Sequence, residues 1–274
     1  MIQSERVAKF RQLHARRPLV LPNAWDAASA RVIEAAGAPA IATTSAGVSW
    51  SLGRRDGQKL KREEMLQVIG NVVESVKVPV SADIESGYGN GSGKDVADTV
   101  QALIAMGVVG INIEDSPGHD GQALLAPEEH ANRIRMARQT AASMGGDLLI
   151  NARTDLYLFQ VGDAKARFSG TVERARLYRQ AGADCVFVPG VIDISTIAEL
   201  VQAIEGPVNV MAMPGAPNAR QLGEIGVARV SVGPWIAQAA LAAAQRAARE
   251  LVEQGSYTSL EESLPFAELN GMFA

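Results

Sequence analysis

The chain is poor in the residues on which several common protein classes depend. Its single cysteine, Cys185, excludes an internal disulfide, and its three histidines form no cluster with it that would hold zinc. No apolar run approaches the roughly 20 residues that a membrane-spanning helix needs. The first residues also lack the apolar segment of a secretory signal. We therefore expect a soluble, cytoplasmic protein.

Two further absences concern charge and catalytic groups. The net charge is −4 and the Lys and Arg residues are scattered, which argues against binding to nucleic acids or anionic membranes. A G-x-S-x-G motif is missing, so a Ser-His-Asp hydrolase lacks support. The lysines avoid every predicted strand, which leaves a Schiff-base aldolase without a nucleophile. These lysines are Lys9, Lys59, Lys61, Lys77, Lys94 and Lys165.

What the chain does contain is a regular alternation of short Val- and Ile-rich strands with amphipathic helices. An N-terminal helix is predicted at residues 4–16, and eight strand-helix units follow it. The predicted strands are residues 19–23, 39–43, 78–84, 110–114, 148–152, 185–188, 208–213 and 229–232. The predicted helices are residues 24–36, 62–76, 95–106, 127–144, 171–181, 194–204, 219–225 and 235–254. This pattern predicts a single α/β domain over residues 1–274, a (β/α)8 TIM-type barrel.

Acidic side chains gather where the predicted strands end. Asp83 and Glu85 are two apart and so face the same way, while Glu114 and Arg153 end the next two strands. Because barrel strands meet at one rim, these groups should converge, and burying like charges there is unfavourable without a partner. Oxygen ligands favour Mg²⁺ or Mn²⁺. An ion-pair network with Arg153 is the alternative, although three carboxylates exceed one arginine.

Loops at the same rim add further candidates. The small residues between 43 and 47 would let backbone N–H groups approach an anion, but they would equally suit a plain turn. They include Ser45, Ala46 and Gly47. Asp56 could reach a cation through water, or it could be an ordinary turn residue. His119 is the one histidine outside the predicted helices and is a candidate catalytic group. Cys185 begins a strand and should be a buried thiol.

Metal-stabilised enolate chemistry is what these groups can support. A cation and Arg153 would neutralise the negative charge that develops on the oxygen of a bound α-keto acid. Two non-catalytic alternatives remain open at this point. One is a barrel that binds α-keto dicarboxylates without turning them over. The other is a phosphate-binding barrel, since Gly215 and Gly233 follow the seventh and eighth strands, where such barrels often seat a phosphate.

Several motifs in combination resemble the isocitrate lyase/phosphoenolpyruvate mutase superfamily. They are Pro22–Asp26, Thr44–Gly47, Ala82–Gly89, Ile113–Asp115 and Asn151–Asp155. The resemblance implies a barrel whose last helix is exchanged between subunits, usually in a tetramer. It also implies Mg²⁺ held directly by Asp83 and through waters by Asp56, Glu85 and Glu114. Ser45, Gly47 and Arg153 would then bind the carboxylate of the α-oxyacid. Glu85 stands where many members have Asp.

Two departures from the family patterns bear on the reaction. The isocitrate and 2-methylisocitrate lyases carry an acid-base cysteine in the loop after the fourth strand, but here that loop, Ser116–Gly121, has none. The phosphonomutases place a His near the end of the sixth strand, where this chain has Val188-Pro189-Gly190. We therefore expect C–C cleavage of the oxaloacetate decarboxylase type, with solvent, Tyr88 or His119 as proton source. P–C chemistry on phosphonopyruvate-like substrates is the second expectation.

The composition of the C-terminal segment, about residues 235–274, indicates that several copies of the chain associate. Its helix at 235–254 is rich in alanine, and the tail that follows carries apolar residues. They are Leu260, Leu264, Phe266, Leu269, Met272 and Phe273. A free monomer would leave this tail poorly covered. We expect the segment to pack on a neighbouring subunit and the protein to be a homo-oligomer, a tetramer of swapped dimers.

Overall fold

A ring of parallel strands forms the centre of the computed structural model, which describes residues 3–15, 18–89, 92–118 and 123–273. The strands are β1 (Leu19–Leu21), β2 (Asn23–Ala24), β3 (Ile41–Thr43), β4 (Val80–Asp83), β5 (Gly110–Glu114), β6 (Leu149–Arg153), β7 (Cys185–Val188), β8 (Val208–Met211) and β9 (Arg229–Ser231). Only Pro22 separates β1, which pairs with β9, from β2, which pairs with β3. The first barrel strand thus consists of two segments that together close the ring, and the predicted (β/α)8 barrel is confirmed.

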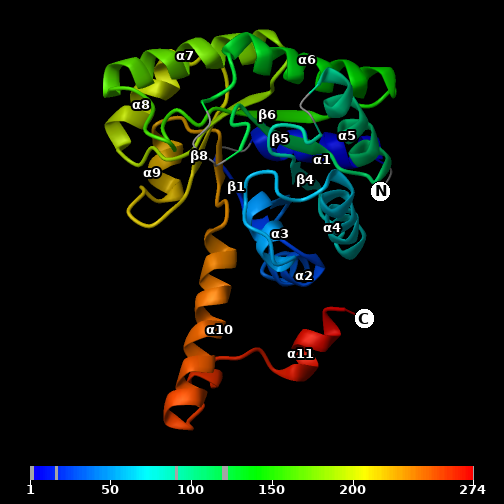
Figure 1. Cartoon of the computed structure of the whole chain (residues 1–274), viewed down its shortest axis with the longest axis vertical. Helices are drawn as coiled ribbons and strands as arrows, with labels where there is room; N and C mark the ends of the chain where they lie inside the picture. The colour runs from blue at the N-terminus through cyan, green and yellow to red at the C-terminus, as the bar shows by residue number, and fades with distance from the viewer. Residues whose placement is uncertain (1–2, 16–17, 90–91, 119–122, 274) are drawn as a thin grey trace.

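Helices cover the outside of this ring (Figure 1). The helices of the described residues are α1 (Gln3–Ala15), α2 (Ala27–Ala35), α3 (Ser45–Ser51), α4 (Arg62–Ser75), α5 (Gly93–Ala105), α6 (Pro127–Ser143), α7 (Ala164–Gln180), α8 (Ile194–Ala203), α9 (Ala219–Glu224), α10 (Trp235–Gln254) and α11 (Phe266–Gly271), and those from α2 to α9 surround the ring. The sequence did not predict α3, α11 or a 3₁₀ turn at Thr258–Leu260. Helix α7 begins seven residues before its predicted start because Asp163 caps it and accepts a hydrogen bond from the Ala166 N–H at 2.8 Å.

One end of the barrel is closed by apolar side chains. Phe10 of α1 is fully buried and packs with Leu19 and Leu149, which begin β1 and β6. The aromatic ring also lies against Gly110, the first residue of β5, where a Cβ would come within 3.0 Å of it. Helix α1 therefore plugs the amino-terminal end of the strands, and only the carboxyl end is left open for a ligand.

The C-terminal segment lies apart from this barrel. Helix α10 projects away from the strands, and α11, near the end of the chain, lies to one side of the far half of α10 (Figure 1). Of the residues in α10, only Ala237 is buried. Leu241 is 55% exposed and Phe266 is 83% exposed. On the barrel itself, the outward-facing Val20 of β1 is 42% exposed. The eighth helix of the barrel therefore does not cover the strands of its own chain.

Across the described residues, the structure holds no helix that is both long enough and apolar enough to span a membrane.

Candidate active site

A cavity of about 310 Å³ opens within the barrel toward the carboxyl ends of the strands. Its walls combine polar side chains with apolar ones such as Trp50, Phe187 and Met211, so it suits a small molecule that carries both charged groups and apolar carbon atoms. The polar lining residues are Asn23, Thr43, Thr44, Ser45, Asp56, Ser81, Asp83, Asn112, Asn151, Arg153, Arg229, Ser231 and Gln238. The predicted candidates Ser45, Ala46, Asp56, Asp83 and Arg153 all lie on this wall.

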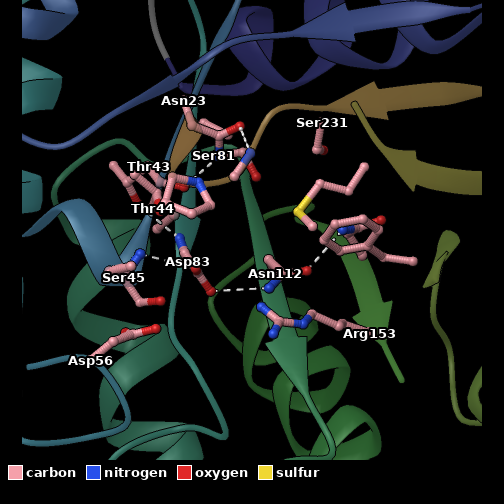
Figure 2. Close-up of a pocket in the computed structure, with 18 of the residues that line it drawn as sticks. Asn23, Thr43, Thr44, Ser45, Asp56, Ser81, Asp83, Asn112, Arg153 and Ser231 are labelled. Atoms are coloured by element: carbon pink, nitrogen blue, oxygen red, sulfur yellow. Dashed lines mark hydrogen bonds between the residues drawn. The ribbon is translucent and has the colours of Figure 1, made fainter. Parts of the chain in front are cut away.

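Asp83 is the last residue of β4 and occupies the centre of the site. One carboxylate oxygen accepts a hydrogen bond from the Ser45 backbone N–H at 3.0 Å, and the other accepts one from the Asn112 side-chain amide at 3.0 Å (Figure 2). The Asp83 backbone N–H in turn donates to the Thr43 hydroxyl at 2.8 Å. Neighbouring strands on both sides thus fix the carboxylate at the cavity wall.

Residues 43–47, expected as a loop or turn, instead lead into helix α3, which begins at Ser45. The N–H groups of a first helical turn have no partner within the helix, which explains why Ser45 can donate to Asp83. Close packing explains why residue 47 is a glycine. A Cβ there would lie 2.7 Å from the Cβ of Trp25 and 2.8 Å from the Cγ2 of Thr44. Only glycine therefore lets α3 lie this close to the rim.

Glu85 does not line the cavity, although it is only two residues beyond Asp83. Its backbone adopts a positive φ of 48°, which turns the chain away from the strand direction. Its carboxylate accepts hydrogen bonds from the Tyr88 hydroxyl at 2.8 Å and from the Gln58 backbone N–H. Burial, with a smaller contribution from Asp56, raises the pKa of Glu85 to about 7. Glu85 therefore lies behind the cavity wall.

Tyr88 was a candidate proton donor, but the structure does not bring it to the cavity. The side chain is 2% exposed, and its hydroxyl is held by Glu85. Burial, and then the nearby Glu85, raise the pKa of Tyr88 well above its ordinary value. The phenol therefore remains protonated and serves as a partner of Glu85.

Arg153 ends β6 and lines the cavity between two carboxylates. Its Nη1 lies 2.8 Å from Glu114 Oε2, and its Nε donates to Asp155 at 2.6 Å. Burial lowers the pKa of Arg153, but Asp155 and Glu114 outweigh this effect, so its pKa is raised above the ordinary value. Burial also raises the pKa of Glu114 well above its usual range, against the influence of Arg153. Glu114 is buried behind Arg153 and, like Glu85, does not line the cavity.

A chain of amide side chains extends from Asp83 across the barrel interior. Asn151 donates to Asn112 at 2.8 Å, and Asn209 lies within 3.4 Å of Asn151 and donates to Ser231 at 3.0 Å. The sequence analysis did not identify Asn209 or Ser231. The sequence pattern could have indicated both residues, because polar residues alternate with apolar ones along β8 and β9, and this alternation places Asn209 and Ser231 on the inner face of the barrel. The barrel interior is thus polar well below the rim.

The remaining candidates are His119, Cys185 and two glycines. His119 lies outside the described residues. Cys185 begins β7 as predicted, is 2% exposed and does not line the cavity. Of the two glycines considered for a phosphate site, Gly233 lies on the cavity wall, whereas Gly215 does not.

The described residues fit a hydrated cation better than a cage made of protein ligands alone. Among them, no three His, Cys, Asp or Glu side chains converge as a complete metal site. Asp83 and Asp56 do face the same cavity, and Mg²⁺ is commonly bound through one or two carboxylates while keeping several waters. The local charge also favours a cation, because the four carboxylates of Asp56, Asp83, Glu85 and Glu114 lie near one another, whereas two arginines, Arg153 and Arg229, lie on the cavity wall.

The barrel and this acidic rim define a member of a lyase and mutase superfamily, and the comparisons agree. The chain belongs to the phosphoenolpyruvate phosphomutase family, whose profile matches residues 10–252. This membership confirms the resemblance to the isocitrate lyase/phosphoenolpyruvate mutase superfamily that the sequence motifs indicated.

Three relatives place the chain within this family. An uncharacterized protein of Mycobacterium tuberculosis is 40% identical over 95% of this chain and 94% of its own length. The 2-methylisocitrate lyase of Aeropyrum pernix is 28% identical over 93% of this chain and 82% of its own length. A crystal structure of a Burkholderia cenocepacia J2315 protein superposes with a TM-score of 0.92 at 36% identity, covering 100% of this chain and 98% of the other. Other relatives with named activities include lyases and mutases.

Proposed function

We propose that this protein is a Mg²⁺-dependent enzyme that cleaves a C–C bond of a small α-keto acid, with decarboxylation of oxaloacetate as the simplest reaction. The observation that carries the proposal is that Asp83 and Arg153 line one small cavity at the carboxyl ends of the strands. Mn²⁺ could replace Mg²⁺ because both prefer oxygen ligands.

The carboxylates and the arginine have separate roles in this proposal. Asp83 would hold the cation directly, and Asp56 would hold it through water. Glu85 and Glu114 would act from behind the cavity wall. The bound cation would supply electrophilic stabilisation of the keto acid. Arg153, together with Ser45 and Gly47 at the start of α3, would bind the carboxylate of the substrate.

Arg153 is suited to stabilise developing negative charge. Its Nε and Nη1 face Asp155 and Glu114, and its Nη2 makes no hydrogen bond within the described part of the chain. This leaves the two N–H groups of Nη2 for a substrate oxygen, with the guanidinium held in a fixed orientation by the two carboxylates. Once CO₂ has left, the enolate needs only a proton. Solvent or His119 could provide it, since the hydroxyl of Tyr88 is bound to Glu85.

The test is release of CO₂ from oxaloacetate with Mg²⁺, compared with the rate that Mg²⁺ alone produces. We expect a rate above this background that disappears in Arg153→Ala. Because that variant leaves Glu114 and Asp155 buried without their cation, Arg153→Lys serves as a second variant that keeps the charge but loses the planar fork. Arg220→Ala is the control, since Arg220 is 88% exposed on α9. A rate equal to the metal background would contradict the proposal.

P–C bond chemistry is the second candidate, and the family membership is what favours it. The profile that matches is that of phosphoenolpyruvate phosphomutase, and the Streptomyces hygroscopicus enzyme of that name is 26% identical over 95% of this chain. Phosphonopyruvate therefore belongs in the same metal-dependent screen. Binding of α-keto dicarboxylates without turnover of any of them would instead favour a sensor or carrier.

We further propose that residues 235–274 pack on the barrel of a second copy, in a tetramer of swapped dimers. Two features support this arrangement. The single chain exposes apolar residues of α10 and α11, and it also exposes Val20 on the outer face of β1, which a barrel helix would normally cover. A helix of the second copy would cover both surfaces at once.

A further inference from the structure

The cavity contains a second arginine that the reaction outlined above does not use. Arg229 lines the cavity and is 2% exposed. It is the first residue of β9, whereas Asp83 and Arg153 are the last residues of their strands. His14 of α1, the helix that plugs the barrel, is close enough for the charge of Arg229 to lower its pKa. Arg229 therefore lies at the floor of the cavity and the acidic rim lies at its mouth.

Arg229 is the less satisfied of the two arginines. Its Nε donates to the Ser231 hydroxyl at 3.1 Å. Within residues 3–15, 18–89, 92–118 and 123–273, its terminal nitrogens make no hydrogen bond and no carboxylate lies within ion-pair distance of them. Burial lowers the pKa of Arg229 to about 10, so the guanidinium still carries its charge at neutral pH. A buried cation without a partner is unfavourable, and it is commonly retained where a ligand completes it.

Ser231 and the amide chain hold this guanidinium in place. The Ser231 hydroxyl that accepts from Arg229 also accepts from Asn209 at 3.0 Å, and Asn209 lies within 3.4 Å of Asn151. The same chain continues through Asn112 to Asp83. The floor and the mouth are thus parts of one polar wall with opposite charges at its two ends.

We propose that Arg229 forms a second anion-binding subsite at the cavity floor, which takes the distal carboxylate of an α-keto diacid. The substrate would lie along the cavity with its keto acid end at Asp83 and Arg153 and its distal carboxylate on the free terminal nitrogens of Arg229. The proposal rests on the proposed function for the position of the keto acid end. It adds that the substrate carries two anionic groups and that Arg229 determines this specificity.

Matched pairs of keto acids test this subsite by binding alone. Each pair has the same chain length and differs in its distal group: oxaloacetate against 2-oxobutyrate, and 2-oxoglutarate against 2-oxopentanoate. Titration calorimetry gives the affinity of each member with Mg²⁺ present. For the pair whose chain is long enough to reach the cavity floor, we expect the diacid to bind about 10- to 100-fold more tightly than the monoacid. A hydrogen bond to a charged group contributes an affinity gain of this size. Arg229→Met should abolish this ratio while leaving the affinity of the monoacid unchanged.

Two further variants separate binding from structure. Arg229→Lys keeps the charge but not the fork, so it should retain part of the preference. Arg220→Met on the surface of α9 should retain all of it. If no pair shows a preference, or if Arg229→Met weakens both members equally, the subsite is refuted and Arg229 only braces Ser231.

A measurement without keto acids keeps this test independent of the reaction. Malonate, succinate and glutarate, without metal, should raise the melting temperature of the wild type and of Arg220→Met but not of Arg229→Met. Phosphate is included as a third kind of anion, and stabilisation by phosphate alone would overturn the assignment to a carboxylate. If the diacids stabilise the protein in this Arg229-dependent way but no decarboxylation is measured, the proposed function is refuted and the subsite is not. Absence of any Arg229-dependent stabilisation would refute the subsite whatever the enzyme catalyses.

Discussion

The carboxyl end of the barrel and the C-terminal segment are both incomplete in a single chain, but in opposite senses. At the carboxyl end, charged groups are buried: Glu85 and Glu114 are each 1% exposed. In the C-terminal segment, apolar groups are exposed: Val252 and Phe266 are each 83% exposed. Each arrangement is unfavourable alone, because carboxylates are removed from water in the first case and apolar side chains lack cover in the second.

The difference indicates two kinds of missing partner. The carboxylates in and behind the cavity wall favour a small cation that can enter the cavity, whereas an exposed apolar helix favours contact with a protein surface. Helix α10 connects the two regions, because the cavity is lined by Gln238 near its start and by Pro234 just before it. The corner after α10 is also fixed, since the carboxylate of Glu250 accepts hydrogen bonds from Ser256 and Thr258. The turn that follows α10 is therefore held in one shape within the single chain.

The largest effect should come from removing the central carboxylate. Asp83→Ala should abolish Mg²⁺ binding and turnover while leaving the fold intact, because Asp83 is a rim residue rather than part of the apolar core. Asp56→Ala should weaken the metal by only about 10- to 100-fold, as expected for a residue that acts through water. Calorimetry with Mg²⁺ measures both. Unchanged metal affinity in Asp83→Ala would show that the acidic rim is not a cation site.

Isocitrate and 2-methylisocitrate test whether the rim carries the acid catalyst of the lyases. We expect negligible cleavage, because the loop Ser116–Gly121 has no cysteine and Cys185 is buried at the beginning of β7. Loss of general acid catalysis typically costs about 10²- to 10⁴-fold in rate. Turnover of either compound near the usual value of about 10 s⁻¹ would refute the argument from the missing cysteine.

The C-terminal segment should respond to a charge placed on its apolar face. Leu241→Asp and Leu251→Asp alter residues that are each 55% exposed in the single chain, so a monomer should tolerate them. If the face is buried against a second copy, the pair of changes should reduce the molar mass measured by light scattering from that of a tetramer. Arg220→Asp on the barrel surface is the control. If the wild type is already a monomer at micromolar concentration, the C-terminal segment is not exchanged between subunits.

Much of the fold and of the rim could be predicted because both follow from strand periodicity. Asp83 and Arg153 end strands whose carboxyl ends must meet in a parallel barrel, and the structure places both on the cavity wall. Glu85 could not be placed correctly from spacing alone. Its positive φ breaks the two-residue alternation, and this conformation is uncommon for a residue other than glycine.

The polar floor was missed for a different reason. Arg229 and Asn209 lie in strands of only three and four residues, so the alternation of polar with apolar residues extends over too few positions to indicate a site. Only the packing of β8 beside β9 brings Asn209 and Ser231 together. Helix α3 was missed because Ser, Gly and Val are not strong helix formers, so its position depends on tertiary contacts.

The smallest effect concerns a buried group that lines no ligand cavity. His130 of α6 is fully buried and packs edge-on against Tyr178, with ring centroids 4.7 Å apart. Burial lowers the pKa of His130 to about 4, with Asp115 opposing the shift. The unfolded chain takes up this proton near pH 6.5, and the folded protein does so only near pH 4. The contribution of His130 to stability is therefore complete above about pH 6.5 and is lost as the pH falls toward 4.

A shift of this size corresponds to roughly 3 kcal/mol of unfolding free energy, an upper estimate for one group. His130→Phe keeps an aromatic ring beside Tyr178 but cannot bind a proton. Denaturant unfolding between pH 4 and pH 7 should show that the variant loses less stability than the wild type on acidification. His14 of α1 has the same lowered pKa of about 4, so the double variant with His14→Phe should flatten the profile further. If the free energies of unfolding of variant and wild type fall in parallel as the pH is lowered, His130 must take up its proton in the folded protein at the same pH as in the unfolded chain. The folded protein would then accommodate a charge on the buried His130 without any ligand, in contrast to the carboxylates at the rim.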